Sequence, residues 1–210
     1  MISLMEKETM KRTQLRDMIS VRQIMKDLRD LSVRDIAPEE RLDEIVAMVA
    51  QRLRVDVCSC YIARPGDILE LAATWGLDKK AVHETFLRVG EGLVGEIALQ
   101  RKPLTFEDAW SHESFVYKPE TKEKAFKSLA GVPLIRSNRL LGVLTVQTKK
   151  IQTFSPDLLE ILETIAMVLA EMLSDNSFKK KEEETPPTEG RQKLEGTSLI
   201  PGWAMGQVLI

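Results

Sequence analysis

A length of 210 residues allows one substantial domain with additional arms, and an apolar fraction of 43% is enough to build a core. The net charge is −2 with acidic and basic residues interleaved, which argues against a nucleic-acid-binding protein. No apolar run reaches the length of a membrane span and no signal peptide is recognisable, so we expect a cytoplasmic protein.

Two helices are predicted at the start of the chain. The first falls within residues 5–31, where apolar residues recur at heptad-like spacing. This stripe consists of Leu15, Met18, Ile24, Met25, Leu28 and Leu31. The stripe fits either a helix that packs on the protein's own core or a helix that forms the seam of a dimer, and we favour the dimer seam. Pro38 suits the first turn of a second helix over residues 39–53.

Residues 55–63 alternate in the manner of a strand, and residues 68–75 return as a second strand after a Pro-Gly-Asp turn. The alternation places Cys58 and Cys60 on the same face. A metal or redox site would need further ligands at a suitable spacing, and the sequence has none. We therefore expect both cysteines to be small buried hydrophobic residues in a reducing compartment.

A G-x-G-x-x-G pattern occupies residues 90–95, between a short strand at 85–89 and a helix at 93–100. A dinucleotide-binding fingerprint requires a parallel βαβ unit, whereas short antiparallel turns link the strands here, so we reject that interpretation. The free N–H groups at the helix start can still receive a carboxylate or a phosphate. Gly92 and Gly95 suit the close approach of a ligand or, equally, tight packing of the helix on the sheet.

A long polar segment rich in aromatic residues, 107–124, follows a short strand at 103–106. Connections of this length inside a compact domain are usually functional, and we interpret this one as a lid over a pocket. Asp108, His112 and Glu113 could form an acid–base group, but we favour a capping and turn role for them. His83 is the other histidine, and the two do not form a known catalytic motif.

Two apolar runs, 129–135 and 140–147, flank the turn sequence Arg-Ser-Asn-Arg and predict a β-hairpin. Both runs are apolar nearly throughout, which favours a central place in a sheet. Ser155, Pro156 and Asp157 then begin a helix that extends to residue 173 and is apolar on more than one side. A charged, proline-containing linker is expected at 175–195, and residues 196–210 are apolar again.

Residues 15–173 resemble a GAF domain, and most closely the one found at the N-terminus of the phosphoenolpyruvate–protein phosphotransferase (enzyme I) of the nitrogen phosphotransferase system. The resemblance rests on VDVCSCYIA (55–63), VGEGLVGEIALQRKPL (89–104), SHESFVYKPET (111–121) and LAGVPLIRSNRLLGVLTVQ (129–147). It implies an α+β fold with a central antiparallel sheet of five to six strands and with the N- and C-terminal helices on one face. Residues 196–210 are similar to the start of that enzyme's phosphohistidine domain.

The resemblance implies four parts: an amphipathic helix (1–31), a GAF sensory domain (32–174), the linker (175–195) and the start of a truncated phosphohistidine domain (196–210). The full enzyme would move phosphate from phosphoenolpyruvate to a histidine and on to a phosphocarrier protein. Its active site and Mg²⁺ would lie beyond residue 210. We therefore expect no catalysis and no cofactor in this chain, which is either an excised regulatory piece or the product of a truncated gene.

The expected role is to sense a small molecule, with glutamine favoured, and so to control autophosphorylation, in a homodimer formed through the terminal helices. No nucleic acid or membrane partner is expected. The pocket is expected between the sheet and the lid, with these candidate residues: Trp75, Gly92, Leu93, Phe106, Asp108, His112, Phe115, Tyr117, Ala130 and Val132. The alternative is a ligand-free module for dimerisation or interaction whose pocket is filled by side chains.

Overall fold

The computed structural model describes residues 21–122 and 125–174. The chain divides into two units, 1–178 and 179–210, and all the described residues belong to the first. Leu15 and Met18, the predicted linker at 175–195 and the predicted phosphohistidine segment at 196–210 therefore lie outside the described residues.

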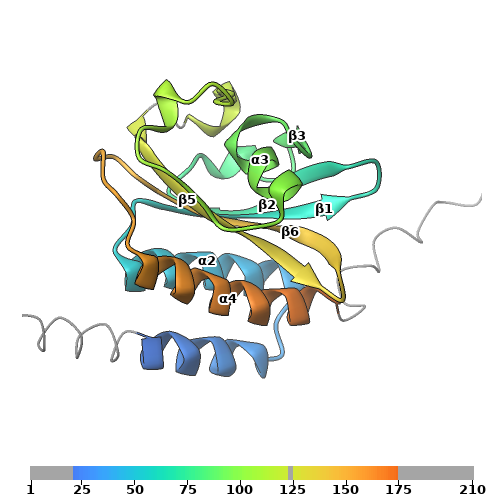
Figure 1. Ribbon diagram of the computed structural model, residues 1–210. Coiled ribbons are helices and arrows are strands. Elements are labelled where there is room, and N and C mark those ends of the chain that lie inside the picture. The colour runs from blue at the N-terminus through green and yellow to red at the C-terminus, as the bar shows by residue number, and fades with distance from the viewer. Residues whose placement is uncertain (1–20, 123–124, 175–210) are drawn as a thin grey trace, which may run out of the picture. The chain divides into compact units, whose positions relative to one another are not determined.

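Six strands form one antiparallel sheet within the described residues, in the order β3-β2-β1-β6-β5-β4 (Figure 1). They are β1 (Val57–Arg64), β2 (Ile68–Trp75), β3 (Phe86–Arg88), β4 (Leu104–Phe106), β5 (Ser128–Arg136) and β6 (Arg139–Thr148). The α+β class and the antiparallel sheet are confirmed. Because every strand pair described is antiparallel, the parallel context of a dinucleotide fingerprint is missing.

The predicted hairpin is β5 and β6, and its central place in the sheet is confirmed. β6 lies between β1 and β5, and β5 lies between β6 and β4. Ser137 and Asn138 form the turn with φ angles of 46° and 60°. Two successive residues with positive φ suit the right-handed twist of a two-residue hairpin. The Arg101 guanidinium, at the end of α3 (Gly92–Gln100), donates a hydrogen bond to the Asn138 carbonyl.

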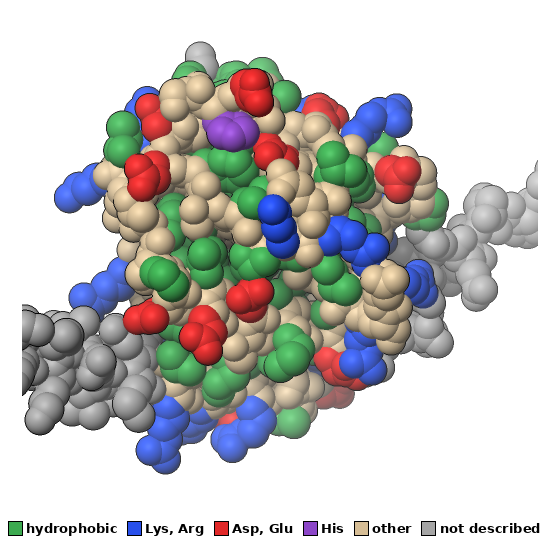
Figure 2. Space-filling view, viewed as in Figure 1, with side chains coloured by type: hydrophobic (Ala, Val, Ile, Leu, Met, Phe, Trp, Pro, Cys, Tyr) green, Lys and Arg blue, Asp and Glu red, His purple; other side chains and the backbone are tan. Residues whose placement is uncertain are grey.

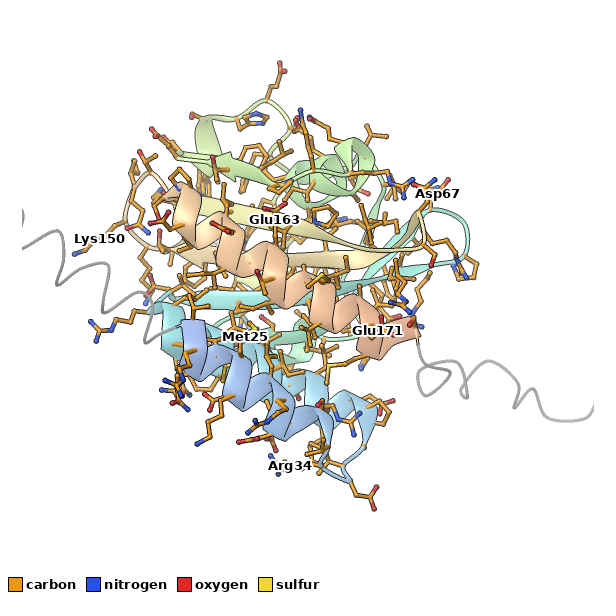
Figure 3. The ribbon with its side chains drawn as sticks, turned by 60° about the horizontal axis from the view of Figure 1, so that its bottom comes forward. Met25, Arg34, Asp67, Lys150, Glu163 and Glu171 are labelled. Carbon is orange, nitrogen blue, oxygen red and sulfur yellow. The ribbon has the colours of Figure 1, made fainter. Side chains whose placement is uncertain are left out.

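The two faces of the sheet carry different covers (Figure 1). α2 (Pro38–Leu53) and α4 (Pro156–Ser174) lie on one face, which we call the helix side, and α3 lies on the other face. A further helix over residues 21–32 packs on the outer side of α2 and α4. Figure 3 shows Met25 on that helix and Glu163 and Glu171 on the neighbouring α4. The terminal helices therefore share one side of the sheet, as predicted.

The helix over residues 21–32 buries its apolar stripe inside the chain's own core. Ile24 and Leu28 are 0% and 1% exposed, and Leu31 is buried with them. They belong to the helix-side cluster together with residues of α2, α4 and the sheet. In the described part of the first helix, the stripe predicted as a dimer seam therefore packs against the core. The homodimer itself stays a prediction.

Cys58 and Cys60 lie on the helix side and are fully buried free thiols, as predicted. Burial raises the pKa of the Cys60 thiol to about 12. Burial, and to a lesser degree the neighbouring Cys60, raises the pKa of Cys58 well above its ordinary value. Because the thiolate is the reactive form, neither cysteine is suited to nucleophilic or redox chemistry. Both act as small apolar residues.

The described helices include none that is long and apolar enough to cross a membrane. On the face shown in Figure 2, acidic and basic side chains are interspersed and do not gather into a patch of one sign.

Candidate functional site

A cavity lies on the α3 side of the sheet, under the segment that connects β4 to β5. We call this segment, residues 107–122 and 125–127, the lid. The cavity has a volume of about 30 Å³, enough for about one ordered water molecule. It is lined by Tyr61, Leu87, Gly92, Leu93, Val94, Ala109, Phe115, Val116, Lys118, Thr121, Phe126, Ser128, Leu129 and Gln147. β1, β3, β5, β6, α3 and the lid all contribute to its wall.

Buried hydroxyl groups distinguish this face of the sheet from the helix side. Ser59 pairs in register with Thr74 on β2 and Thr145 on β6, and all three are at most 1% exposed. The Ser59 and Thr74 hydroxyl oxygens lie 2.7 Å apart and share a hydrogen bond. Since strand side chains alternate, Ser59 points away from the neighbouring cysteines, toward the side of the cavity. The sheet therefore offers polar groups where a purely structural core would hold apolar ones.

The lid carries an ordered set of aromatic side chains. The Trp110 ring stacks on Phe115 with 5.0 Å between centroids, and Tyr117 lies 6.3 Å away on a tilted plane. The Trp110 indole N–H donates to the Phe126 carbonyl at 2.9 Å, and the Lys127 ammonium lies 4.8 Å from the Trp110 ring. These contacts join the two ends of the lid.

An ion pair fastens the lid to the start of α3. The Lys118 ammonium donates to a Glu91 carboxylate oxygen at 2.8 Å, and the other oxygen accepts the Arg88 backbone N–H at 2.9 Å. The hydrogen bond from Lys118, then that from Arg88, lowers the pKa of Glu91 below its ordinary value. Among the described residues of the cavity wall, Lys118 is the one with a charged side chain. The wall therefore combines a cation with the N-terminal turn of a helix, and both favour an anion.

We expect acid to weaken this Lys118–Glu91 pair. The folded pKa of Glu91 is lowered, so its stabilisation is fully present above the unfolded glutamate pKa of about 4.3 and is lost as the pH falls below it. The pair is partly exposed, so we expect a contribution of about 1 kcal/mol or less. The difference in urea unfolding between the wild type and Glu91→Gln should be larger at pH 6 than near pH 3.5. A difference that is the same at both pH values would contradict this.

The glycines of the G-x-G-x-x-G pattern have separate roles. A side chain at Gly95 would place its Cβ 2.4 Å from the Arg88 carbonyl oxygen. The glycine therefore allows α3 to pack closely against the residues that precede it in the chain. Gly92 has a φ of 66° and lines the cavity, with Val116 of the lid directly over it. The packing interpretation therefore applies to Gly95, and Gly92 is available to a ligand.

Gly92, Leu93 and Phe115 are the three predicted pocket residues that line the cavity. Phe106 is buried nearby in the core between the sheet and α3. Trp75 ends β2 and is 42% exposed, away from the lining residues.

The predicted polar residues of the lid serve its own structure. Asp108 accepts the Trp110 backbone N–H and caps a 3-10 turn, which confirms the capping role that we favoured for it. His112 accepts the Ser114 N–H at Nδ1 and meets the Phe106 ring edge-on. Neither His112 nor the lid residue Tyr117, which lies beside Trp110, is among the lining residues.

Ala130 and Val132 require a correction. Both are fully buried in the helix-side cluster, opposite the cavity. Because strand side chains alternate, it is their neighbour Leu129 that faces the cavity. The sequence predicted that the strand is buried on both faces. It did not predict which face lies toward the cavity and which lies toward α2 and α4.

Five polar lining residues were missed: Tyr61, Lys118, Thr121, Ser128 and Gln147. Strand alternation was a usable signal for Tyr61, which is out of phase with Cys58 and Cys60. Lys118 lies inside the SHESFVYKPET segment but carried no local sign of its partner, Glu91, 27 positions earlier.

The chain belongs to the GAF domain family, which matches it over residues 37–173, well over half its length. Among curated proteins, it is 31% identical over 156 residues to "Phosphoenolpyruvate-dependent phosphotransferase system" of Escherichia coli, covering 72% of this chain and 21% of that protein. It is 26% identical over 111 residues to the Nif-specific regulatory protein of Azospirillum lipoferum, covering 51% of this chain and 18% of that one. The chain thus spans about a fifth of the length of these relatives.

Among solved structures, the GAF domain of a phosphoenolpyruvate-protein phosphotransferase from Coxiella burnetii superposes with a TM-score of 0.71 at 27% identity. That alignment covers 80% of this chain and 98% of the solved one. The match to a solved GAF domain confirms the fold.

Proposed function

We propose that residues 21–174 act as a regulatory, small-molecule-sensing GAF domain of a phosphoenolpyruvate–protein phosphotransferase of the nitrogen phosphotransferase system. The observation that carries this proposal is the cavity under the lid, whose described wall has polar side chains and a lysine. A concave pocket with a few convergent polar groups is the usual form of a small-molecule site. The similarity to the phosphotransferase proteins and the Nif regulator supports a role in regulation.

The chemistry of the wall favours a small molecule with a carboxylate. Lys118 and the first N–H groups of α3, at Gly92 and Leu93, attract an anion. Gln147 of β6, also in the wall, carries an amide that can hydrogen-bond the remainder of the ligand. Glutamine has both a carboxylate and an amide and is the effector we propose. In this scheme Lys118 exchanges the Glu91 carboxylate for that of the ligand.

Glutamine needs much more room than the present cavity volume of about 30 Å³. Binding therefore requires the lid to move outward, and the aromatic stack and the Lys118–Glu91 pair have to open first. Part of the binding free energy is spent on that opening, which lowers the apparent affinity. The sensor converts the presence of a ligand into a displacement of the lid.

A thermal-shift experiment tests the proposal. Glutamine at about a hundredfold over its dissociation constant should stabilise the chain by about 2.7 kcal/mol, equivalent to about 5–10 °C in melting temperature. Lys118→Met should abolish the shift, because it removes the cation of the wall. The matched control is Lys122→Met, a lid lysine that pairs with Asp78 and does not line the cavity. No shift with glutamine, 2-oxoglutarate, cyclic nucleotides or phosphoenolpyruvate would sink the sensing proposal.

The small size of the cavity also favours a second candidate, a ligand-free module for dimerisation or interaction. In that case the lining side chains, led by Phe115 and Phe126, are the permanent filling. The thermal-shift screen separates the two candidates, since a filled core gains nothing from any of the ligands.

Under the first proposal this chain does not catalyse and holds no cofactor. Phosphoryl transfer, its Mg²⁺ and the phosphocarrier protein belong to domains other than residues 21–174, and the GAF domain sets the rate of autophosphorylation. We further propose a cytoplasmic homodimer that forms through the terminal helices. Sedimentation equilibrium of the full chain at several concentrations should give twice the monomer mass. A monomer mass throughout would contradict the dimer.

A further inference from the structure

Ser128 occupies a crossing point between the lid and the segment that leads into α4. It is the first residue of β5, it is 1% exposed, and it is among the residues that line the cavity. On one side the lid begins at Glu107. On the other, residues 149–155 lead from β6 to the start of α4 at Pro156, and Figure 3 shows Lys150 within this connection.

The Ser128 hydroxyl contacts both segments. Its oxygen lies 2.5 Å from the Glu107 carbonyl oxygen and 3.1 Å from the Lys150 carbonyl oxygen, and it accepts the Gln152 N–H at 2.9 Å. A second contact joins the same segments, since the Thr153 hydroxyl donates to the Glu107 carboxylate. We call these four contacts the Ser128 junction.

One hydroxyl hydrogen serves two carbonyl oxygens at this junction. A serine hydroxyl has a single hydrogen to donate, so Glu107 and Lys150 compete for it. The shorter distance favours Glu107 while the lid is closed. The Lys150 carbonyl has a second donor, the Thr148 hydroxyl at 2.9 Å, and is satisfied in either case. If the lid carried Glu107 away, residues 149–155 would lose the contact between Thr153 and Glu107, and the Ser128 hydroxyl would keep only its contacts with Lys150 and Gln152.

We propose that the Ser128 junction couples the position of the lid to the connection that leads into α4, with Ser128 as the positioning residue. The inference rests on the proposed function in one respect: it describes how occupancy of the same cavity would reach α4. A bound ligand that lifts the lid would loosen residues 149–155 and the first turn of α4. Coupling of this kind requires an element with two alternative arrangements, and the shared hydroxyl hydrogen provides one.

Hydrogen exchange measured by mass spectrometry on the full chain tests the coupling without any ligand. Phe115→Ala loosens the lid by removing the ring that stacks on Trp110. In the otherwise wild-type chain, we expect Phe115→Ala to accelerate amide exchange over residues 149–158 about fivefold. In a chain that already carries Ser128→Ala, adding Phe115→Ala should accelerate this exchange less than about twofold. Glu113→Ala, an exposed substitution in the same lid, is the matched control and should change neither. Peptides from β1 report any global loss of stability.

A second background keeps the test decisive if Ser128→Ala fails to fold. Thr153→Val changes an exposed side chain and removes only its contact with Glu107, and it should reduce the effect of Phe115→Ala on residues 149–158. Unchanged exchange in Phe115→Ala, or equal acceleration in all backgrounds, would overturn the coupling. Because no ligand is used, that result is distinguishable from a failure of glutamine to bind.

Discussion

Replacing Leu28 by alanine should lower the free energy of unfolding by about 2–5 kcal/mol, the usual cost of emptying a fully buried leucine site. For a chain of this size, that is equivalent to about 4–20 °C in melting temperature. Leu28 is 1% exposed and packs with Ile24 and Leu31 against the helix-side core. Since these contacts are within one chain, the loss should not depend on protein concentration.

The concentration dependence separates the two interpretations of the first helix. If its stripe were a dimer seam, Leu28→Ala would act mainly by weakening association, so the difference in melting temperature between the variant and the wild type would change with protein concentration. Arg29→Ala is the matched control on the same turn, because that side chain is 69% exposed and should change stability by less than about 0.5 kcal/mol. Melting curves at protein concentrations a hundredfold apart make the comparison. A penalty seen only at high concentration would contradict the packing described above.

Replacing Gly142 by alanine should be the most damaging small substitution in the sheet. Gly142 lies in β6 opposite Ile62 of β1, and a Cβ there would lie 2.1 Å from the Tyr61 carbonyl oxygen. That oxygen belongs to the backbone of a neighbouring strand and cannot rotate away, so β1 and β6 would have to separate locally. We expect a loss of about 1–3 kcal/mol or more. Because Tyr61 lines the cavity, the same change should weaken any ligand binding.

Gly131→Ala gives the comparison for Gly142. A Cβ at Gly131 would lie 2.5 Å from Ile97 Cδ1, the far end of a flexible side chain, with the next atom at 3.1 Å. A side-chain end can rotate, so this variant should lose less stability than Gly142→Ala. Chemical denaturation of the two variants side by side measures the difference. Equal losses, or a larger loss at Gly131, would show that the rigidity of the backbone is not the deciding factor.

The central hairpin was predictable from its sequence because its determinants are local. Residues 128–148 contain two apolar runs of strand length and a Ser-Asn turn, and the turn adopts the positive φ angles that such hairpins need. The antiparallel order followed from short connections. The role of Asp108 was also local, since a capping side chain and the N–H that it accepts are two positions apart.

The cavity was less predictable because its wall comes from distant parts of the chain. The ten candidate residues included three of the lining residues, and they missed Lys118, whose partner Glu91 belongs to another element. The position of Ser128 was equally hidden, because its contacts with Glu107 and Gln152 depend on two connections that meet there. Such contacts are set by tertiary packing and leave no periodic trace in the sequence.

The sequence by itself determined the elements, the antiparallel sheet and the burial of both faces of the hairpin, because hydrophobic period and turn chemistry act over a few residues. Only the tertiary structure decided that Leu129 faces the cavity while Ala130 faces the helices. It also decided that the described part of the first helix's stripe, from Ile24 to Leu31, packs against the chain's own core. The physical reason is the same in both cases. A pattern shows that a side chain is buried, and only long-range packing selects what buries it.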